Sequence, residues 1–219
     1  MESAMPGGGN QMMSQLSGFV RVALWTILTV CTAVAADQNT FESREAGVKI
    51  TKPADWHFLS AKAAAENLAL PKFRNREIEK EIRSRPNMPF LVIARYQEPH
   101  VGINPSVQVT LKTQGDLVGK GAVPLLTKIT DRLKRTFGDF SFVEPVTETT
   151  LDGNPAARMA ASYTVTDADG KEFKTRARMW VVPRGDYMLT FSMAGANEGP
   201  DVSEKEFGQI LQSIRIAKP

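Results

Sequence analysis

The sequence predicts an α+β fold in which helices cover both faces of an antiparallel β-sheet, an α/β/α sandwich. Three strand-like segments with alternating apolar and polar residues follow one another between residues 155 and 196, separated by short turns rich in glycine and aspartate. Two amphipathic segments, residues 123–137 and 203–214, have apolar side chains at helical spacing. A meander with amphipathic helices on either side of it in the chain is typical of a layered α+β domain.

The register of the first hairpin in this meander follows from its side chains. A two-residue turn would place Met159 opposite Arg178 and mix apolar with charged faces. A three-residue loop at residues 168–170 instead pairs Met159 with Met179, and Gly170 then stands where a positive φ is needed. One face of the hairpin is therefore predicted to be core. The opposite face carries a row of cations beside an indole: Arg158, Lys174, Arg176, Arg178 and Trp180.

The ends of the two amphipathic helices carry their own signals. Ser203 and Glu206 have the S-x-x-E spacing of a capping box, and Val202 is placed to pack on Phe207. Gly138 follows the earlier helix and is predicted to be its C-cap. Both helices therefore have boundaries that the sequence defines.

The remaining segments are predicted to add strands and two further helices. Residues 90–96 are apolar on both faces, which indicates a strand covered on each side. The other predicted elements are a short opening hairpin at residues 48–51 and 56–59, helices at 61–70 and 73–85, a half-buried strand at 107–111, a strand at 140–150 and a turn at residues 152 and 153.

The N-terminal residues 1–36 are predicted to be an extension followed by a secretory signal peptide. Arg21 precedes the uncharged stretch 22–36, which is shorter than the about 20 apolar residues that a membrane span needs. The small residues Ala33 and Ala35 supply a signal-peptidase pattern. The alternative is an uncleaved membrane anchor. After cleavage we expect a periplasmic or secreted protein with a polar arm at 37–46 and a single domain at 47–219.

The single cysteine, Cys31, lies inside this N-terminal segment. Leu28 stands three residues before it, as in the signal of a lipoprotein, so the alternative location is a lipid-anchored envelope protein. Val30 stands where such signals usually have glycine or alanine. With the signal peptide removed, the mature chain has no cysteine, which excludes disulfides, thiolate nucleophiles and cysteine metal sites.

The charge of the chain is close to balanced. It has 27 basic and 24 acidic residues among 219, a net charge of +3. This small excess does not indicate a nucleic-acid partner. It favours peripheral contact with an anionic membrane only where the cations are clustered.

The sequence contains no motif for catalysis, for a metal or for a cofactor. The two histidines, His57 and His100, lie far apart and outside any metal-ligand spacing. The glycine-rich stretch 115–121 is one residue short of a phosphate loop and is interpreted as a lead into the next helix. Residues 167–170 lack the flanking ligands of a calcium loop and are interpreted as a turn. We therefore expect no catalytic residues, no metal and no cofactor.

The order of these elements resembles the PsbP-like family. Its members include the extrinsic PsbP protein of photosystem II, DcrB-type bacterial envelope proteins and the yeast Ran-binding protein Mog. The resemblance rests on the opening GVKITKPADWHFL, the strand PSVQVTLKT, the meander from LDGNPAARMAASYT to YMLTFSMAG, and the final EFGQILQSIRI. It implies an α/β/α sandwich that binds partners, and it assigns no site residues.

Three functions are compatible with these observations. The first is a non-enzymatic envelope protein that binds an unidentified envelope partner or assists assembly. The second is a carrier of a small ligand or lipid with a pocket between sheet and helix, and the third is an uncharacterised enzyme. The cationic row is the candidate site, for an acidic partner, an anionic ligand or a phospholipid head group. The alternative is that its cations are solvated or pair with acids such as Glu77 or Glu81, with Trp180 packed under a helix.

Overall fold

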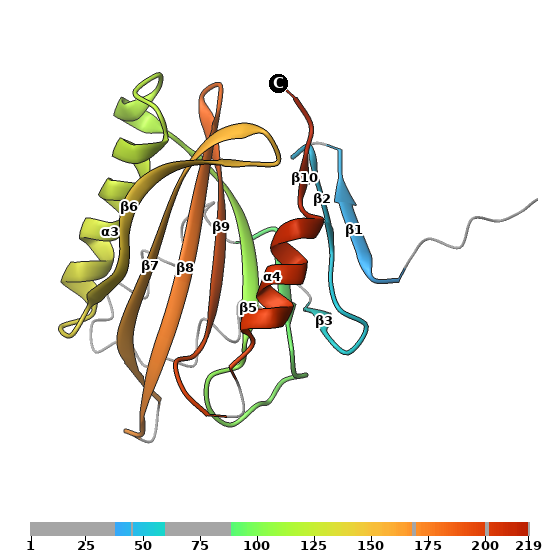
Figure 1. Ribbon diagram of the computed structural model, residues 1–219, viewed down its shortest axis with the longest axis vertical. Helices are drawn as coiled ribbons and strands as arrows, with labels where there is room; N and C mark the ends of the chain where they lie inside the picture. The colour runs from blue at the N-terminus through green and yellow to red at the C-terminus, as the bar shows by residue number, and fades with distance from the viewer. Residues whose placement is uncertain (1–37, 45, 60–88, 168–169, 200–201, 219) are drawn as a thin grey trace, which may run out of the picture. The chain divides into compact units, whose positions relative to one another are not determined.

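The computed structural model describes residues 38–44, 46–59, 89–167, 170–199 and 202–218 (Figure 1). The predicted signal peptide, Cys31 and the helices predicted at 61–70 and 73–85 lie outside these residues. The same holds for Glu77 and Glu81. Within the described part of the chain, no helix is both long and apolar enough to span a bilayer.

Seven antiparallel strands form the main sheet, in the order β3-β4-β5-β9-β8-β7-β6. This confirms the predicted antiparallel α+β fold. All four residues of β4 are buried, as predicted for a strand covered on both sides. The strands are β3 (His57–Leu59), β4 (Leu91–Ala94), β5 (Ser106–Thr113), β6 (Ser141–Leu151), β7 (Asn154–Thr166), β8 (Glu172–Arg184) and β9 (Tyr187–Ala196).

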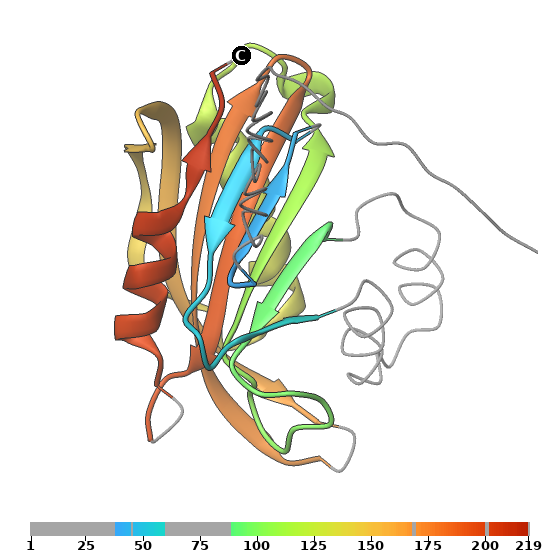
Figure 2. The ribbon, with the colours of Figure 1, turned by 90° about the vertical axis from the view of Figure 1, so that its right-hand side faces the viewer.

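A second, three-stranded sheet was not predicted. It consists of β1 (Thr40–Ser43), β2 (Val48–Thr51) and β10 (Arg215–Ile216), with β2 in the middle (Figure 2). The predicted opening hairpin is wrong, because β2 pairs with β1 and β10 whereas β3 pairs with β4. The prediction of a polar arm at 37–46 is also wrong in part, because Thr40–Ser43 form β1 and pair with β2. Phe41 packs against the main core from this strand, so one aromatic residue anchors a segment that is otherwise polar.

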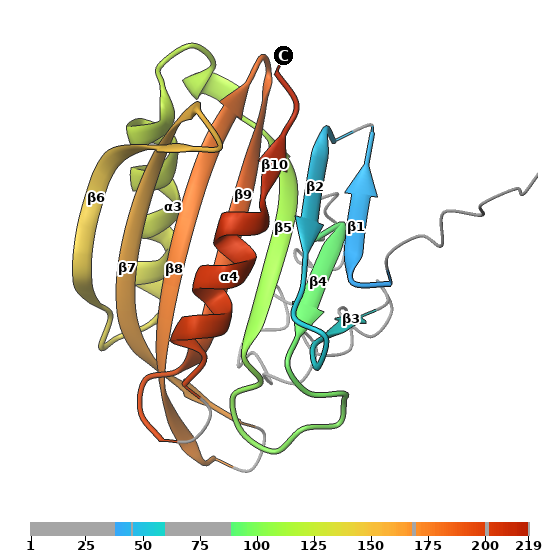
Figure 3. The ribbon, with the colours of Figure 1, turned by 45° about the vertical axis from the view of Figure 1, so that its right-hand side comes forward.

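The helices lie on opposite faces of the main sheet (Figure 3). Helix α3 (Ala122–Thr136) follows the short helix η1 (Gly115–Leu117) and packs on β6, β7 and β8. Its core includes Leu126, Met159 and Val181. Helix α4 (Glu204–Ser213) covers the other face, where Phe207 and Ile210 join a larger core. The sheet therefore has a hydrophobic core on each side.

The meander has the predicted register. Met159 pairs with Met179 across β7 and β8, and Gly170 has a φ of 85°. The turn between β6 and β7 consists of Asp152 and Gly153, with φ values of 48° and 73°. Two residues with positive φ form the turn that matches the twist of paired strands. The alternation of apolar side chains and the position of Gly170 were sufficient to predict the register of the hairpin formed by β7 and β8.

The predicted helix caps are wrong in detail. Ser203 precedes α4, but its hydroxyl does not cap the helix; it accepts a hydrogen bond from Nη1 of Arg95 at 3.1 Å. Val202 remains 37% exposed. Gly138 is not left-handed, because α3 ends when Phe137 becomes extended and stacks on Tyr163 with ring centroids 4.1 Å apart. In both places a tertiary contact replaces the local cap.

Candidate binding surface on strands β6 to β8

The structure brings all five predicted site residues onto one face of the main sheet. Lys174, Arg176, Arg178 and Trp180 alternate along β8 on the side that α4 covers. Arg158 of β7 lies directly opposite Trp180 in the register and therefore shares this face. The cationic row is thus a structural feature of neighbouring strands.

Trp180 belongs to the core. Only 6% of its surface is exposed, and it lies in the apolar cluster that includes Phe191 of β9 and Phe207 of α4. Its indole stabilises the sheet by burial of a large apolar surface. It is not accessible to a partner, so the exposed part of the row consists of cations alone.

Arg176 and Arg178 share one carboxylate. Glu204, the first residue of α4, has one oxygen 2.5 Å from Nη2 of Arg178 and the other 3.9 Å from Nε of Arg176. The second distance is too long for a hydrogen bond, and Nε of Arg176 is buried without a partner. The two arginine side chains remain about a third exposed, at 32% for Arg176 and 28% for Arg178. One charge is therefore compensated closely and the other loosely.

Arg158 and Lys174 have no ion pair with α4 among the described residues. Nη2 of Arg158 is 3.5 Å from Oε2 of Glu144 on β6, with 49% of the arginine side chain exposed. Lys174 is exposed and its charge contributes to lowering the pKa of the Asp139 carboxyl, after the larger effect of hydrogen bonds from Thr164. Both cations are available to solvent and to a second molecule.

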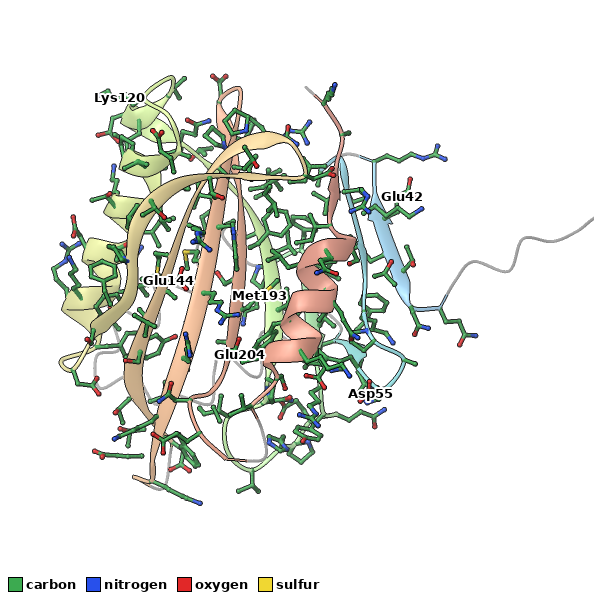
Figure 4. All side chains as sticks on the ribbon, viewed as in Figure 1. Glu42, Asp55, Lys120, Glu144, Met193 and Glu204 are labelled. Carbon is green, nitrogen blue, oxygen red and sulfur yellow. The ribbon has the colours of Figure 1, made fainter. Side chains whose placement is uncertain are left out.

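The charged residues occupy positions that are paired across neighbouring strands of the sheet. Glu144, Ala160, Arg178 and Met193 occupy successive partner positions across β6, β7, β8 and β9. Figure 4 labels Glu144 and Glu204, the two acids of this surface. We call this surface the arginine strip; its residues are Glu144, Arg158, Lys174, Arg176, Arg178 and Glu204.

The arginine strip carries four cations and two carboxylates, so its net charge is positive. Planar guanidinium groups bind carboxylates with two parallel hydrogen bonds, which gives geometric specificity as well as attraction. All six side chains retain exposure. The strip is therefore suited to contact with carboxylate groups of another molecule.

The acids of the strip were missed by the sequence analysis. A glutamate is favoured electrostatically at the start of a helix, so the position of Glu204 needs no ion-pair partner to explain it. Nothing else in the sequence indicated that it pairs with a strand. Glu144 follows a bulge in β6, where the register shifts and strict alternation no longer indicates the face. Both assignments require the packed structure.

The remaining candidates form no site among the described residues. His57 lies on β3, whereas His100 stacks on Tyr96 in the loop between β4 and β5, with ring centroids 4.4 Å apart. The described part of the chain contains no group of three or more side chains that could hold a metal ion. Residues 115–121 connect β5 to α3, as predicted.

No protein-family profile matches the chain, and no curated protein matches it. Solved structures to which this chain is similar include LpqN of Mycobacterium tuberculosis, described as involved in cell envelope biogenesis. It is 16% identical, with a TM-score of 0.47, over 78% of this chain and 83% of LpqN. The cyanobacterial PsbP protein of Synechocystis sp. PCC 6803 is 12% identical, with a TM-score of 0.46, over 87% of this chain and 99% of that protein.

A protein from Bacteroides thetaiotaomicron is also similar. It is 12% identical, with a TM-score of 0.45, over 84% of this chain. The present chain spans 50% of the length of that protein.

Proposed function

We propose that this chain is an exported, non-enzymatic envelope protein that binds an acidic partner protein through the arginine strip. The observation that carries the proposal is the incomplete compensation of the strip. Arg176 and Arg178 share the single carboxylate of Glu204, and Nε of Arg176 has no hydrogen-bond partner. A partner carboxylate would pair with the exposed part of these two arginine side chains.

The geometry of the strip supports a protein partner with several acids. The cations are spaced along two adjacent strands, so their side chains form a rigid array held by the backbone ladder. Attraction between such an array and an acidic surface raises the rate of association and selects the partner by charge. Exposed pairs within the strip, such as Arg158 with Glu144, contribute little to stability and exchange easily for an external partner.

The test uses reversal of the two cations that do not anchor α4. Arg158→Glu with Lys174→Glu removes positive charge from the strip and leaves the contact of Arg178 with Glu204 in place. The matched control is Lys120→Glu with Lys218→Glu, which changes the net charge equally at exposed sites outside the strip. Figure 4 labels Lys120 near the start of α3.

The measurement is crosslinking in intact cells, followed by identification of the captured proteins. We expect an acidic protein to be captured by the wild type and the control, and to be lost with the double reversal in the strip. Circular dichroism of the purified variants verifies that both remain folded. Equal capture of the same acidic protein by all three proteins would refute the proposal.

A further inference from the structure

Glu204 occupies the position on the arginine strip that a carboxylate of another molecule would take. Figure 4 labels it at the start of α4. Its Oε2 lies 2.5 Å from Nη2 of Arg178, and its Oε1 lies 3.9 Å from Nε of Arg176. Guanidinium groups bind an external carboxylate through these same N–H groups. A partner carboxylate therefore competes with Glu204 for Arg178.

The backbone that carries Glu204 is held at both ends of α4 by other contacts. The hydroxyl of Ser203, immediately before the helix, accepts a hydrogen bond from Nη1 of Arg95 at 3.1 Å. The hydroxyl of Ser213, the last residue of the helix, accepts one from the amide of Thr51 at 3.0 Å. Because neither bond involves the carboxylate of Glu204, α4 keeps its place when that carboxylate is displaced.

The side chain of Glu204 can move without opening the core. It is 41% exposed, so its carboxylate already has access to water. The apolar packing of α4 is carried by Phe207 and Ile210, which are buried. An ion pair between partly exposed groups is weak, because water solvates each separated partner. Exchange of Glu204 for a partner carboxylate therefore requires only a rotation of its side chain.

A carboxylate attached to the fold competes well against a single carboxylate in solution. Its attachment gives it a roughly millimolar effective concentration at the guanidinium groups. A ligand with several adjacent acids also contacts Arg158 and Lys174, which are exposed. Once such a ligand is held there, the displacement of Glu204 becomes an intramolecular step and is favoured. The strip therefore distinguishes clustered acids from isolated ones.

We propose that Glu204 is an internal competitor that restricts the arginine strip to protein segments with clustered acids. This role of Glu204 rests on the proposed function, since it concerns the same surface. An acidic segment first contacts the exposed cations Arg158 and Lys174. It then replaces Glu204 at Arg178 and gains the second part of the strip. The partner segment is thus a run of glutamates or aspartates.

Calorimetric titration of the purified protein with a poly-glutamate peptide at low salt tests the competition. Glu204→Gln removes the competing charge, and we expect it to bind the peptide about threefold to fivefold more tightly than Glu206→Gln. Glu206 lies in the same first turn of α4, so both variants change the net charge of the protein equally. The difference between them therefore measures the contact with Arg178 and excludes a general effect of charge.

The gain in affinity should depend on Arg178. In Arg178→Gln the guanidinium that Glu204 occupies is absent, so the addition of Glu204→Gln should change the affinity for the peptide by less than about twofold. Circular dichroism verifies the fold of each variant. If Arg178→Gln does not fold, the comparison of Glu204→Gln with Glu206→Gln is sufficient by itself.

A second peptide tests the selection of clustered acids. It has the same length and a single glutamate, and we expect no measurable binding of it to the wild type. Equal affinity of the wild type for both peptides would overturn the selection of clustered acids.

Three other results distinguish this role of Glu204 from the proposed function. Binding by the wild type, with equal affinities of Glu204→Gln and Glu206→Gln, would overturn the competition and leave the proposed function in place. Binding by Glu204→Gln alone would support the competition and contradict the proposed function of the wild type. No binding by the wild type or by either variant would overturn both.

Discussion

Glu204 joins the start of α4 to the middle of β8, because its carboxylate lies 2.5 Å from Nη2 of Arg178. The same carboxylate is favoured electrostatically at the first turn of the helix. Phe207, one turn farther along, carries the apolar side of the same attachment, with its ring edge-on to Trp56 at 5.7 Å between centroids. The attachment of α4 thus has an ionic part and an apolar part that can be tested separately.

Glu204→Gln should lower the free energy of unfolding by about 1 kcal/mol. The charge-assisted hydrogen bond to Arg178 is lost, and the partial exposure of both side chains limits the effect. Glu206→Gln is the matched control, because Glu206 lies in the same turn and has no ion pair with a described residue. Urea unfolding of the two variants measures the difference. Equal stabilities would show that the contact with Arg178 does not hold the helix.

Phe207→Ala should cost about 3 kcal/mol or more, because Phe207 is 6% exposed and fills the core between α4 and the sheet. Phe142→Ala serves as control, because Phe142 is 37% exposed. Denaturant unfolding should rank the two losses in this order. A larger loss for Phe142→Ala would contradict the assignment of the core.

Asp152→Ala should destabilise the protein by about 2 kcal/mol. Asp152 has a left-handed φ of 48°, and its Oδ2 accepts a hydrogen bond from the amide of Ile216 at 2.7 Å. Alanine removes the acceptor and is strained at this φ. Asparagine keeps an acceptor and tolerates the conformation, so Asp152→Asn should lose less than about 1 kcal/mol. Thermal unfolding compares the two, and equal losses would show that the bond to β10 is not stabilising.

The sequence was sufficient for the hairpin of β7 and β8 and insufficient for the second sheet. Side-chain alternation and Gly170 determine a local register, because only one loop length keeps like faces together. Strand β10 has two residues, too few to show a strand pattern, and its partner β2 lies near the other end of the chain. The sequence therefore does not predict it. Ser203 has the signature of a cap, yet Arg95, 108 residues earlier, occupies its hydroxyl. Contacts between residues so far apart in the sequence depend on how the whole chain packs, which local patterns do not indicate.

For the candidate binding surface, the sequence likewise predicted which side chains share a face but not which of them are exposed. Alternation placed Arg158, Arg176 and Arg178 on one face correctly. Trp180 has the same alternation and is nevertheless buried, because it packs in the core cluster that includes Phe207 and Ile210 of α4. Which cations stay exposed depends on the position of the helix, and that position follows from the packing of Phe207 and Ile210.

Tyr163 should ionise at a higher pH than an ordinary tyrosine. Burial raises the pKa of its phenol to about 12, from an ordinary value near 10. The folded state therefore favours the neutral phenol; this contribution is complete below pH 10 and is lost as pH rises from about 10 to 12. Tyrosinate absorbance at 295 nm should lose a component that titrates near pH 12 in Tyr163→Phe. Loss of an early component would contradict the burial of this phenol.

The central claim is that the arginine strip binds acidic groups of a partner. Its most direct test is calorimetric titration of the purified protein with a poly-glutamate peptide at low and high salt. We expect binding that weakens with salt and is lost in the double variant Arg158→Glu and Lys174→Glu, with binding retained in Lys120→Glu and Lys218→Glu. Equal binding by both double variants, or no binding by the wild type at low salt, would contradict it.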